Sequence, residues 1–403
     1  MGAVEKLEAA FAEWLGAPGA VATGYGRGAL WLALELIIGG NPSAEVLVPD
    51  FICQQVPEAV RRAGGSPVYF PVRRDLTVHE AEVEAAITGR TRAAVLVHYY
   101  GRGLHNIERL AELCRRRNIV VIEDCALALG ARVNGALAGR FGDLAIFSFT
   151  KSDWCYGGGM IATAARDWLP HLRQLREGKC HPARRLALCY GLLRRADCAA
   201  NTPGFSRVAG RVGAWLERGL STFEPALRPP SREERSSGGR HAPAYSGNFF
   251  DIGRFDALMP AFAARRALRI LFTLDARTAR RRAAAGHFEI VIRRRLRRMS
   301  QVNPTEMTAI GSGENARLSD ALLSFRNHSD AGDTGSFLLF NASDGCAFLW
   351  SDRAEAAGCT LRLAWPAYQE DLAARGGSAF PAVAVNPDRD WLRDHFLIVE
   401  NPL

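Results

Sequence analysis

The chain has 403 residues, of which 48% are hydrophobic and 23% charged, and its formal net charge is +9. These fractions are ordinary for a globular protein and exclude a disordered, collagen-like or coiled-coil chain. At about 150 residues per domain the length predicts two or three domains, which can bury a large core without disulfides or structural metals.

The basic charge comes almost entirely from arginine. Of the 51 lysines and arginines, only Lys6, Lys151 and Lys179 are lysines, and the other 48 are arginines. Such a balance invites a nucleic-acid interpretation. The strongest candidate, segment 277–298, has no groove-reading motif and a single aromatic, Phe288. We therefore expect a solvated helix face and no specific nucleic-acid partner.

Location and metal content are addressed by three features. No run approaches the roughly 18 consecutive apolar residues of a membrane-spanning helix. The N-terminus mixes acidic residues with apolar residues at helical spacing, which predicts an amphipathic helix and not a signal peptide. The nine cysteines form no CxxC pair, which argues against a zinc or iron–sulfur site. We expect a cytoplasmic protein without metal and without membrane association.

Residues from about 20 to 165 alternate apolar, β-branched runs with amphipathic stretches. This pattern predicts an α/β fold, in which a mostly parallel sheet is covered by helices on both faces and joined by right-handed crossovers. The predicted strands are Glu45–Phe51, Pro67–Val72, Ala93–Tyr99, Ile119–Asp124, Leu144–Phe149 and Met160–Thr163, and the predicted helices include Gln54–Ala63, Glu80–Ile87 and Ile107–Arg117.

We divide the chain into two domains. The large domain, 1–245, contains this core and then a helical, arginine-dotted stretch that ends in a polar loop (166–245). Residues 246–403 begin with long helices over 250–300 and continue as short strands and helices, which predicts a smaller α+β domain.

Polar residues follow several predicted strands. Ligands of an open parallel sheet bind at the carboxyl ends of its strands, so we expect these residues to converge at one rim. They fall into four groups: Asp124; His98, Tyr99 and Tyr100; Ser148, Thr150 and Lys151; and, opening a helix, Gly24, Gly26 and Gly28.

Each of these features also has a simpler interpretation. A carboxylate after a strand is often a helix cap, and glycines before a helix can form only a turn. The G-x-G-x-G spacing matches neither the dinucleotide fingerprint nor a P-loop. Glycines at a helix N-terminus also form an anion cradle from backbone N–H groups and the helix dipole.

Lys151 is the most informative of these residues. Arginine replaces lysine almost everywhere else, and a guanidinium cannot perform amine chemistry, so Lys151 indicates a reactive amine. An amine, a carboxylate and an anion cradle together suit pyridoxal 5'-phosphate (PLP). This cofactor needs a lysine for its Schiff base, an acid for its pyridinium nitrogen and a helix N-terminus for its phosphate.

The run from Val46 to Thr163, with GRGALWLAL ahead of it, resembles the DegT/StrS family of fold-type I PLP-dependent aminotransferases. The matching pieces occur in family order and include VLVPDF, VVIEDCALALGA, LAGRFGDLAIFSFTK and GGGMIAT. Many members of this family act on nucleotide-linked keto-sugars. The resemblance implies the fold-type I architecture, a homodimer and PLP as cofactor.

The resemblance also implies roles for single residues. Lys151 matches the lysine that carries the cofactor and shuttles protons, and Asp124 matches the carboxylate on the pyridine nitrogen. Ser148 matches the serine that binds the phosphate. The helix-start phosphate loop is matched by Gly26, Arg27 and Gly28. Asn248 weakly matches an asparagine that reaches a phosphate across the dimer interface.

Three positions depart from the family pattern. Arg27 stands where the family often has serine or threonine, and an arginine can pair with the phosphate directly. Leu127 replaces a glutamine that usually contacts the ring oxygen of the cofactor. Cys53 aligns with the aromatic that commonly stacks on the ring, so we expect Phe51, Tyr99 or His98 to substitute for that aromatic.

Three functions stay open at this point. The preferred one is a PLP-dependent aminotransferase with an amino-acid donor, glutamate by family habit, and a keto or aldehyde acceptor. A nucleotide-linked keto-sugar of glycan or secondary-metabolite synthesis is one such acceptor. Leu127 and the unmatched C-terminal third suggest the alternative of elimination, replacement or cyclisation on an amino-acid-like substrate. The third is a non-catalytic regulatory or binding descendant, against which Lys151 argues.

Overall fold

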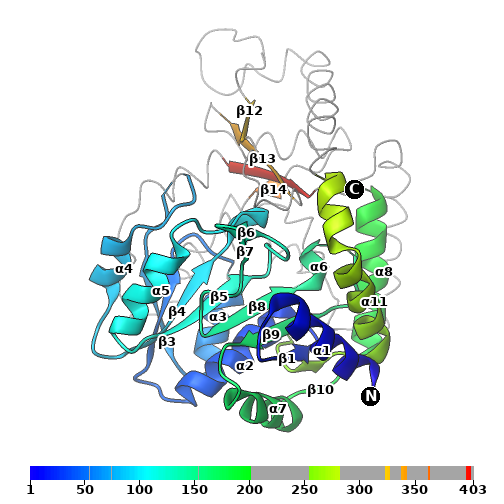
Figure 1. Cartoon of the computed structure of the whole chain (residues 1–403), viewed down its shortest axis with the longest axis horizontal. Helices are drawn as coiled ribbons and strands as arrows, with labels where there is room; N and C mark the ends of the chain where they lie inside the picture. Colours follow the sequence, from blue (N-terminus) through cyan, green and yellow to red (C-terminus); the bar gives the residue numbers. More distant parts are fainter. Residues whose placement is uncertain are drawn as a thin grey trace, which may run out of the picture.

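The computed structural model describes residues 1–53, 55–73, 75–152, 154–200 and 254–281, and the backbone of four further strands (Figure 1). Asn248 and most of segment 277–298 lie outside the described residues. The domain boundary at residue 245 also lies outside them and stays a prediction.

A seven-stranded sheet forms the centre of the described part, in the order β1-β9-β8-β5-β4-β2-β3. The strands from β8 to β3 run parallel, and β9 and β1 pair antiparallel at one edge. The bounds are Gly19–Thr23 (β1), Glu45–Pro49 (β2), Ser66–Phe70 (β3), Thr91–Val97 (β4), Val120–Cys125 (β5), Leu144–Ser148 (β8) and Gly159–Thr163 (β9). The predicted α/β fold with a mostly parallel sheet is therefore confirmed.

Two details of the sheet differ from the prediction. The short strand β1 was not predicted, because GAVAT is rich in glycine and alanine and carries little β propensity. Strand β9 is antiparallel to β8 because the segment 149–158 between them is too short for the crossover that a parallel return needs, typically a dozen or more residues. The connecting segment begins with the short helix α6, Phe149–Ser152.

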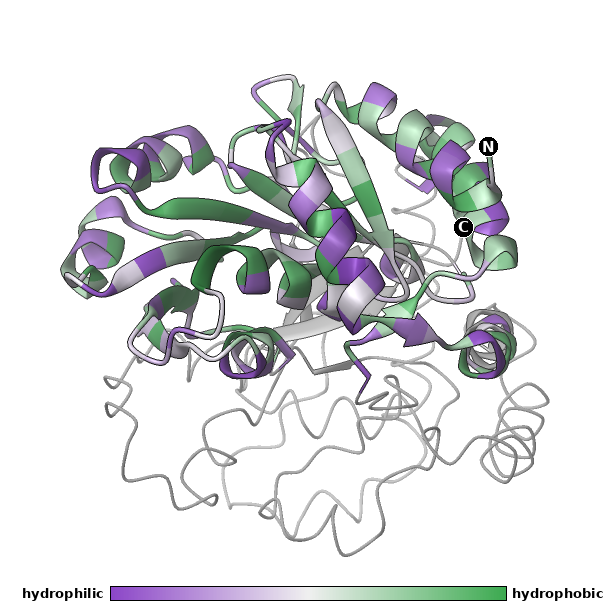
Figure 2. Ribbon diagram, turned by 90° about the horizontal axis from the view of Figure 1, so that it is seen from below, coloured by the Kyte–Doolittle hydropathy of each residue, from purple (hydrophilic) through white to green (hydrophobic). Residues whose placement is uncertain are grey.

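Helices cover both faces of this sheet. Near β1, β9 and β8, one face packs on α1 (Ala3–Leu15) and α11 (Ala261–Phe272), which lie side by side at the right of Figure 1. The opposite face packs on α2 (Gly26–Ile38), α3 (Gln55–Arg62) and α7 (Trp168–Lys179). Helix α5 (Ile107–Arg116) connects β4 to β5 and packs on β5. Figure 2 shows the hydrophobic strands between helices whose outer sides are more hydrophilic.

The N-terminal helix behaves as its sequence pattern predicts. Leu7, Phe11 and Leu15 are at most 1% exposed, and the ring of Phe11 packs edge-on against Phe147 of β8. The remaining helices of the described part are α4 (Glu80–Ala86) and α8 (Arg184–Ala200), and a 3₁₀ turn lies at Tyr99–Gly101. In the part of the chain that the structure describes, no helix is both long and apolar enough to span a membrane.

Short strands complete the described structure. A hairpin joins β6 (Arg132–Val133) to β7 (Ala136–Leu137), and β10 (His181–Pro182) pairs with β11 (Ala257–Leu258). In the C-terminal region β12 (Leu323–Arg326), β13 (Phe337–Ala342), β15 (Phe396–Glu400) and β14 (Arg362–Leu363) form an antiparallel sheet in that order. Strand β13 lies in the stretch after residue 300, where the sequence predicts short strands and helices.

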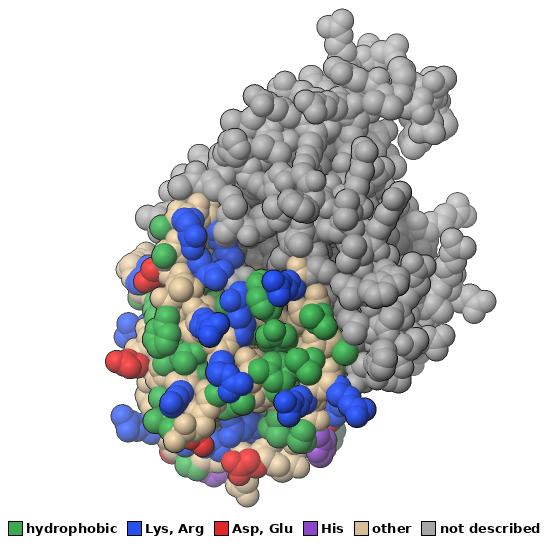
Figure 3. Space-filling view, turned by 90° about the vertical axis from the view of Figure 1, so that its right-hand side faces the viewer, with side chains coloured by type: hydrophobic (Ala, Val, Ile, Leu, Met, Phe, Trp, Pro, Cys, Tyr) green, Lys and Arg blue, Asp and Glu red, His purple; other side chains and the backbone are tan. Residues whose placement is uncertain are grey.

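Many arginines of the described surface are paired with carboxylates. On helices, Arg62 lies 2.9 Å from Glu58, and Arg116 lies 2.9 Å from Glu112, each one turn apart. Figure 3 shows basic side chains spread singly or in small groups among hydrophobic ones on one side of the molecule. This arrangement is that of solvated helix faces, in which such pairs are worth only a few tenths of a kcal/mol each.

Candidate active site

The carboxyl ends of three neighbouring parallel strands form the predicted rim. Asp124 of β5 lies between Val97 of β4 and Ile146 of β8 in the sheet register. Ser148 is the last residue of β8, and Lys151 follows it within α6. The parallel register therefore brings the carboxylate, the serine and the lysine of the prediction to the same edge of the sheet.

Asp124 is a buried carboxylate, only 7% exposed. Burial raises the pKa of Asp124 to about 6, although a 2.9 Å hydrogen bond from the Ala126 N–H and the positive charge of Lys151 lower it. A buried carboxylate is costly to ionise unless a cation lies beside it. A pyridinium nitrogen is such a cation, so the environment of Asp124 fits the role that the sequence assigns to it.

The N-terminus of α2 lies against the end of β8. A Cβ added at Gly26 would lie 3.1 Å from the Ser148 Cβ and 3.5 Å from its Oγ, and Ser148 Oγ lies 3.0 Å from Thr150 Oγ1. Tyr25, the residue before the helix, makes no side-chain hydrogen bond that would cap it. The amides of the first turn, the helix dipole and two hydroxyls thus form a cradle that suits a phosphate.

Arg27 lies in the first turn of α2. Its Nη1 donates a 3.1 Å hydrogen bond to Oε1 of Gln55, the first residue of α3. The sequence does not predict Gln55 as a site residue, because a glutamine at the start of a predicted helix carries no distinctive signal. The bond ties the arginine to the rim, which agrees with its predicted role as a charged partner of the phosphate.

Gly28 is required by a close backbone approach. A Cβ at this position would lie 2.3 Å from the carbonyl oxygen of Phe255. Gly178, in α7, has no atom within 4 Å of its hypothetical Cβ. Both glycines lie in helices, but only Gly178 has room for a Cβ atom.

Alanine substitutions at these two glycines should have opposite effects. We expect Gly178→Ala to raise the free energy of unfolding by about 0.5–1 kcal/mol, the usual gain from glycine to alanine in a helix. Gly28→Ala should instead lower it by about 1–3 kcal/mol, since overpacking against a backbone carbonyl forces the chain to shift. Urea unfolding of both variants measures this. Stabilisation by Gly28→Ala would contradict the close packing of α2 on segment 254–258.

The aromatic residues expected to replace the stacking ring are all buried. Phe51 and Tyr99 are each 3% exposed, their ring centroids lie 6.1 Å apart, and the Tyr99 hydroxyl donates a 2.8 Å hydrogen bond to the Phe51 carbonyl. Cys53 is half-buried in the loop between β2 and α3, and Leu127 is half-buried against the core. Phe51 and Tyr99 are thus packed in the hydrophobic core.

His98 requires a correction. We had predicted a contact between His98 and the cofactor, but the side chain has no exposed surface and both ring nitrogens have partners inside the protein. His98 follows Val97, which pairs with Asp124, so it takes the next place in the register, beside Cys125. Successive side chains of a strand alternate between faces, which places His98 on the face of Glu123 and Cys125, opposite Asp124.

Glu123 is the residue that the sequence interpretation missed. It is a fully buried carboxylate in β5, directly before Asp124, and it accepts the hydrogen bond from His98. A second charged residue at the end of an apolar run was the available signal, because buried charges in proteins are paired.

The fold defines the structural class of the protein. A mostly parallel sheet covered by helices on both faces is the architecture of the fold-type I PLP-dependent transferases. Residues 2–186 match the model of the DegT/DnrJ/EryC1/StrS aminotransferase family. The predicted resemblance is therefore confirmed.

Two curated relatives illustrate the similarity. The chain is 38% identical over 164 residues to the "pleiotropic regulatory protein" of Geobacillus stearothermophilus, which is 40% of this chain and 44% of that protein. It is 40% identical over 174 residues to a UDP-N-acetyl-3-dehydro-alpha-D-glucosamine 3-aminotransferase of Acidithiobacillus ferrooxidans, which is 42% of this chain and 47% of that protein. The matched region thus spans about half the length of these relatives.

A solved structure supports the fold over a longer stretch. A GDP-4-keto-6-deoxymannose-3-dehydratase, solved with a trapped PLP-glutamate geminal diamine, superposes with a TM-score of 0.62 at 15% identity. The superposition covers 100% of this chain and 88% of that one. At this identity the likeness establishes the fold alone.

Proposed function

We propose that the protein is a PLP-dependent aminotransferase that moves an amino group from an amino-acid donor, glutamate, to a nucleotide-linked keto-sugar. The observation that carries the proposal is the buried Asp124, held at the same rim as Lys151 and the N-terminus of α2. These are the three groups that PLP requires, and they come from three separate elements of the fold.

The residues at the rim divide the work. Lys151 would carry the cofactor covalently and, once freed by the substrate amine, hold and return the proton of the substrate Cα. Asp124 would stay ionised beside the pyridine nitrogen. Ser148, Arg27 and the amides of Gly26 and Gly28 would hold the phosphate. Bound PLP supplies the electron sink for the substrate carbanion.

The substrate class is supported by the relatives. The Acidithiobacillus relative is named for amination of a UDP-linked 3-dehydro sugar. We extend this to a nucleotide-linked keto-sugar as the acceptor here. A homodimer in which Asn248 reaches a phosphate of the partner, a cytoplasmic location, and the absence of a nucleic-acid partner belong to the same proposal.

Absorbance spectroscopy with glutamate tests the proposal. The purified protein should bind PLP in a form that absorbs in the visible. Addition of glutamate should bleach this band and release 2-oxoglutarate, and mass spectrometry should find pyridoxamine phosphate. A protein that does not bind PLP would contradict the proposal. Binding of PLP without a reaction with glutamate would support PLP as the cofactor but contradict glutamate as the amino donor.

A different reaction of the same cofactor is the second candidate. One solved structure with the same fold is that of a dehydratase, and Leu127 departs from the family glutamine. Under this alternative the protein would eliminate a hydroxyl from a keto-sugar or act on an amino-acid-like substrate. Loss of water from the acceptor without net amination, measured by mass spectrometry, would favour it.

The Geobacillus relative is named a regulatory protein, which keeps a non-catalytic role in view. Lys151 and Asp124 are both in place at the rim, which speaks for catalysis. Tight and salt-dependent DNA binding by the cofactor-free protein would favour the regulatory role.

A further inference from the structure

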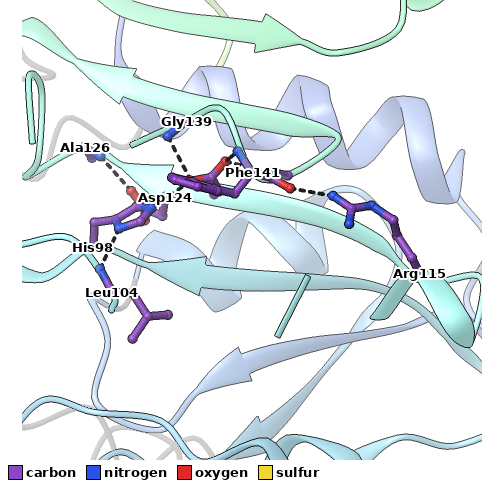
Figure 4. A network of polar contacts seen from close by, with 9 residues as sticks. His98, Leu104, Arg115, Asp124, Ala126, Gly139 and Phe141 are labelled. Carbon is purple, nitrogen blue, oxygen red and sulfur yellow. Dashed lines mark hydrogen bonds and ion pairs between the residues drawn. The ribbon is translucent and has the colours of Figure 1, made fainter. Parts of the chain in front are cut away.

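A buried polar chain lies directly behind Asp124, on the opposite face of β5 (Figure 4). Its centre is Glu123, whose carboxylate has no exposed surface. Glu123 Oε1 accepts the backbone N–H groups of Phe141 and Gly142 at 2.6 Å each, and Oε2 accepts Gly139 N–H at 2.8 Å. The fourth donor is His98 Nε2, also at 2.8 Å. The hydrogen-bonding capacity of this carboxylate is therefore satisfied within the protein.

The hydrogen bonds define the tautomer of His98. The Leu104 N–H points at Nδ1 across 2.9 Å, so Nδ1 is an acceptor and carries no proton. The ring proton of a neutral imidazole then lies on Nε2, from which it is donated to Glu123. Each hydrogen bond is thus donated in the same direction, from Leu104 to His98 and from His98 to Glu123.

The chain fixes two segments beside the rim. On one side, Tyr100 (φ 51°) and Gly101 (φ 85°) turn the backbone sharply after β4, and the bond from Leu104 to His98 closes this turn. A left-handed conformation is unfavourable for tyrosine and persists only where the surroundings impose it. On the other side, Glu123 holds the segment 139–142 that leads into β8, and Arg115 Nη2 donates to the Phe141 carbonyl at 2.7 Å.

Asp124 is linked to these hydrogen-bonded residues through the backbone. It directly follows Glu123, and its carbonyl oxygen accepts the His98 N–H at 3.0 Å. A rotation of Glu123 or His98 would therefore move the peptide units that aim the Asp124 side chain at the opposite face. A displacement of about 1 Å in a reactive group can cost about 100-fold in rate.

His98 and Glu123, together with Cys125, are residue types that bind metals, and their ligand atoms lie within 4.8 Å of one another. The hydrogen bonds argue against a metal there. Three backbone N–H groups already point at the Glu123 oxygens, and both His98 nitrogens are engaged. Burial raises the pKa of the Cys125 thiol well above its usual range, so the thiol stays protonated and is a poor ligand.

We propose that His98 and Glu123 are a pair of positioning residues that hold Asp124 in place for a cofactor at the rim. This rests on the proposed function. The pair acts through the strand end and the two rim segments, and His98 transmits the constraint only while it donates to Glu123.

Two substitutions at His98 separate its two hydrogen bonds. His98→Gln retains an N–H donor near the position of Nε2, and so retains the bond to Glu123. His98→Asn retains an acceptor near the position of Nδ1, and so retains the bond from Leu104. Val95→Ala, in the buried middle of β4, serves as a control for loss of core packing. Asp143→Asn is a matched control, because Asp143 bonds the other end of β5 through the Val121 N–H at 2.8 Å.

The first measurement is the Kd of each cofactor-free variant for PLP, determined by fluorescence titration. We expect His98→Asn to raise the Kd about 10–100-fold, by analogy with the loss of a hydrogen-bond partner behind a metal ligand. His98→Gln and both controls should stay within about 3-fold of the unaltered protein. Equal binding by the two His98 variants, or equal weakening by Val95→Ala and His98→Asn, would overturn the proposal.

The second measurement is amide hydrogen exchange in the cofactor-free variants. His98→Asn should speed exchange at Gly139 but not at Leu104, and His98→Gln should do the reverse. Failure of the unaltered protein to bind PLP would refute the proposed function itself and with it the role toward the cofactor. PLP binding combined with unchanged exchange at Gly139 in His98→Asn would refute the positioning pair alone.

Discussion

Replacing Lys151 with alanine is expected to abolish the visible absorbance of bound PLP and to lower the rate of amino transfer by about 10³-fold or more. The lysine is the only residue at the rim that can bond covalently to the cofactor and then move the substrate proton, so no neighbour can take its place among the described residues. The spectrum of the purified variant after dialysis against PLP, together with single-turnover kinetics, measures both effects.

Lys179 provides a matched control for this substitution. It lies at the exposed end of α7, 2.7 Å from Glu35, far in sequence from the rim. Lys179→Ala should keep the spectrum and stay within about 2-fold in rate, since neither partner of this ion pair is among the rim residues. A visible band that survives in Lys151→Ala would show that another amine carries the cofactor and would remove the basis of the proposed function.

Asp124→Asn is expected to have opposite effects on activity and on stability. Amino transfer should fall by about 10²–10⁴-fold, because asparagine cannot keep the pyridine nitrogen protonated. The cofactor-free protein should nevertheless become more stable at pH 8. The rise of the pKa from 3.8 to about 6 corresponds to about 3 kcal/mol that the folded protein spends on ionising this buried group.

The dependence on pH gives this prediction its sign. Between about pH 4 and pH 6 the folded protein keeps the Asp124 proton that the unfolded chain has already released. The contribution of Asp124 to the free energy of unfolding therefore falls as the pH rises through this window, and it stays low above pH 6. Asparagine removes that fall while its Oδ1 can still accept the Ala126 N–H.

Urea unfolding of both cofactor-free proteins at pH 4 and pH 8 tests the expectation. The variant should gain up to about 3 kcal/mol over the unaltered protein at pH 8 and much less at pH 4. Because both proteins share every other titrating group, the difference between them isolates Asp124. A variant that is less stable at pH 8 would mean that Asp124 is stabilised as an anion in the absence of cofactor.

Much of the site was accessible from residue types alone. Lys151 stood out because arginine had replaced nearly every other lysine, and Asp124 and Ser148 stood out because they end apolar runs. Glu123 lies next to Asp124 at the end of the same run but was passed over. Because successive side chains of a strand point to opposite faces of the sheet, Asp124 faces the site and Glu123 faces the core on the other side. The glycines of α2 pointed to an anion cradle, whereas the contact that makes Gly28 necessary comes from Phe255, more than two hundred residues further on.

The sequence by itself determined the fold class, the order of the strands along the chain and the chemistry of the rim, because apolar periodicity and the choice between lysine and arginine are local properties. Only the tertiary structure decided where each strand ends, that β9 runs antiparallel, and that His98 faces Glu123. The register between β4 and β5 decides the face of every side chain, and register arises from pairing between strands, which a single strand does not contain. The excess of arginine over lysine did not identify a binding partner, but it made the rare lysine at the rim, Lys151, conspicuous.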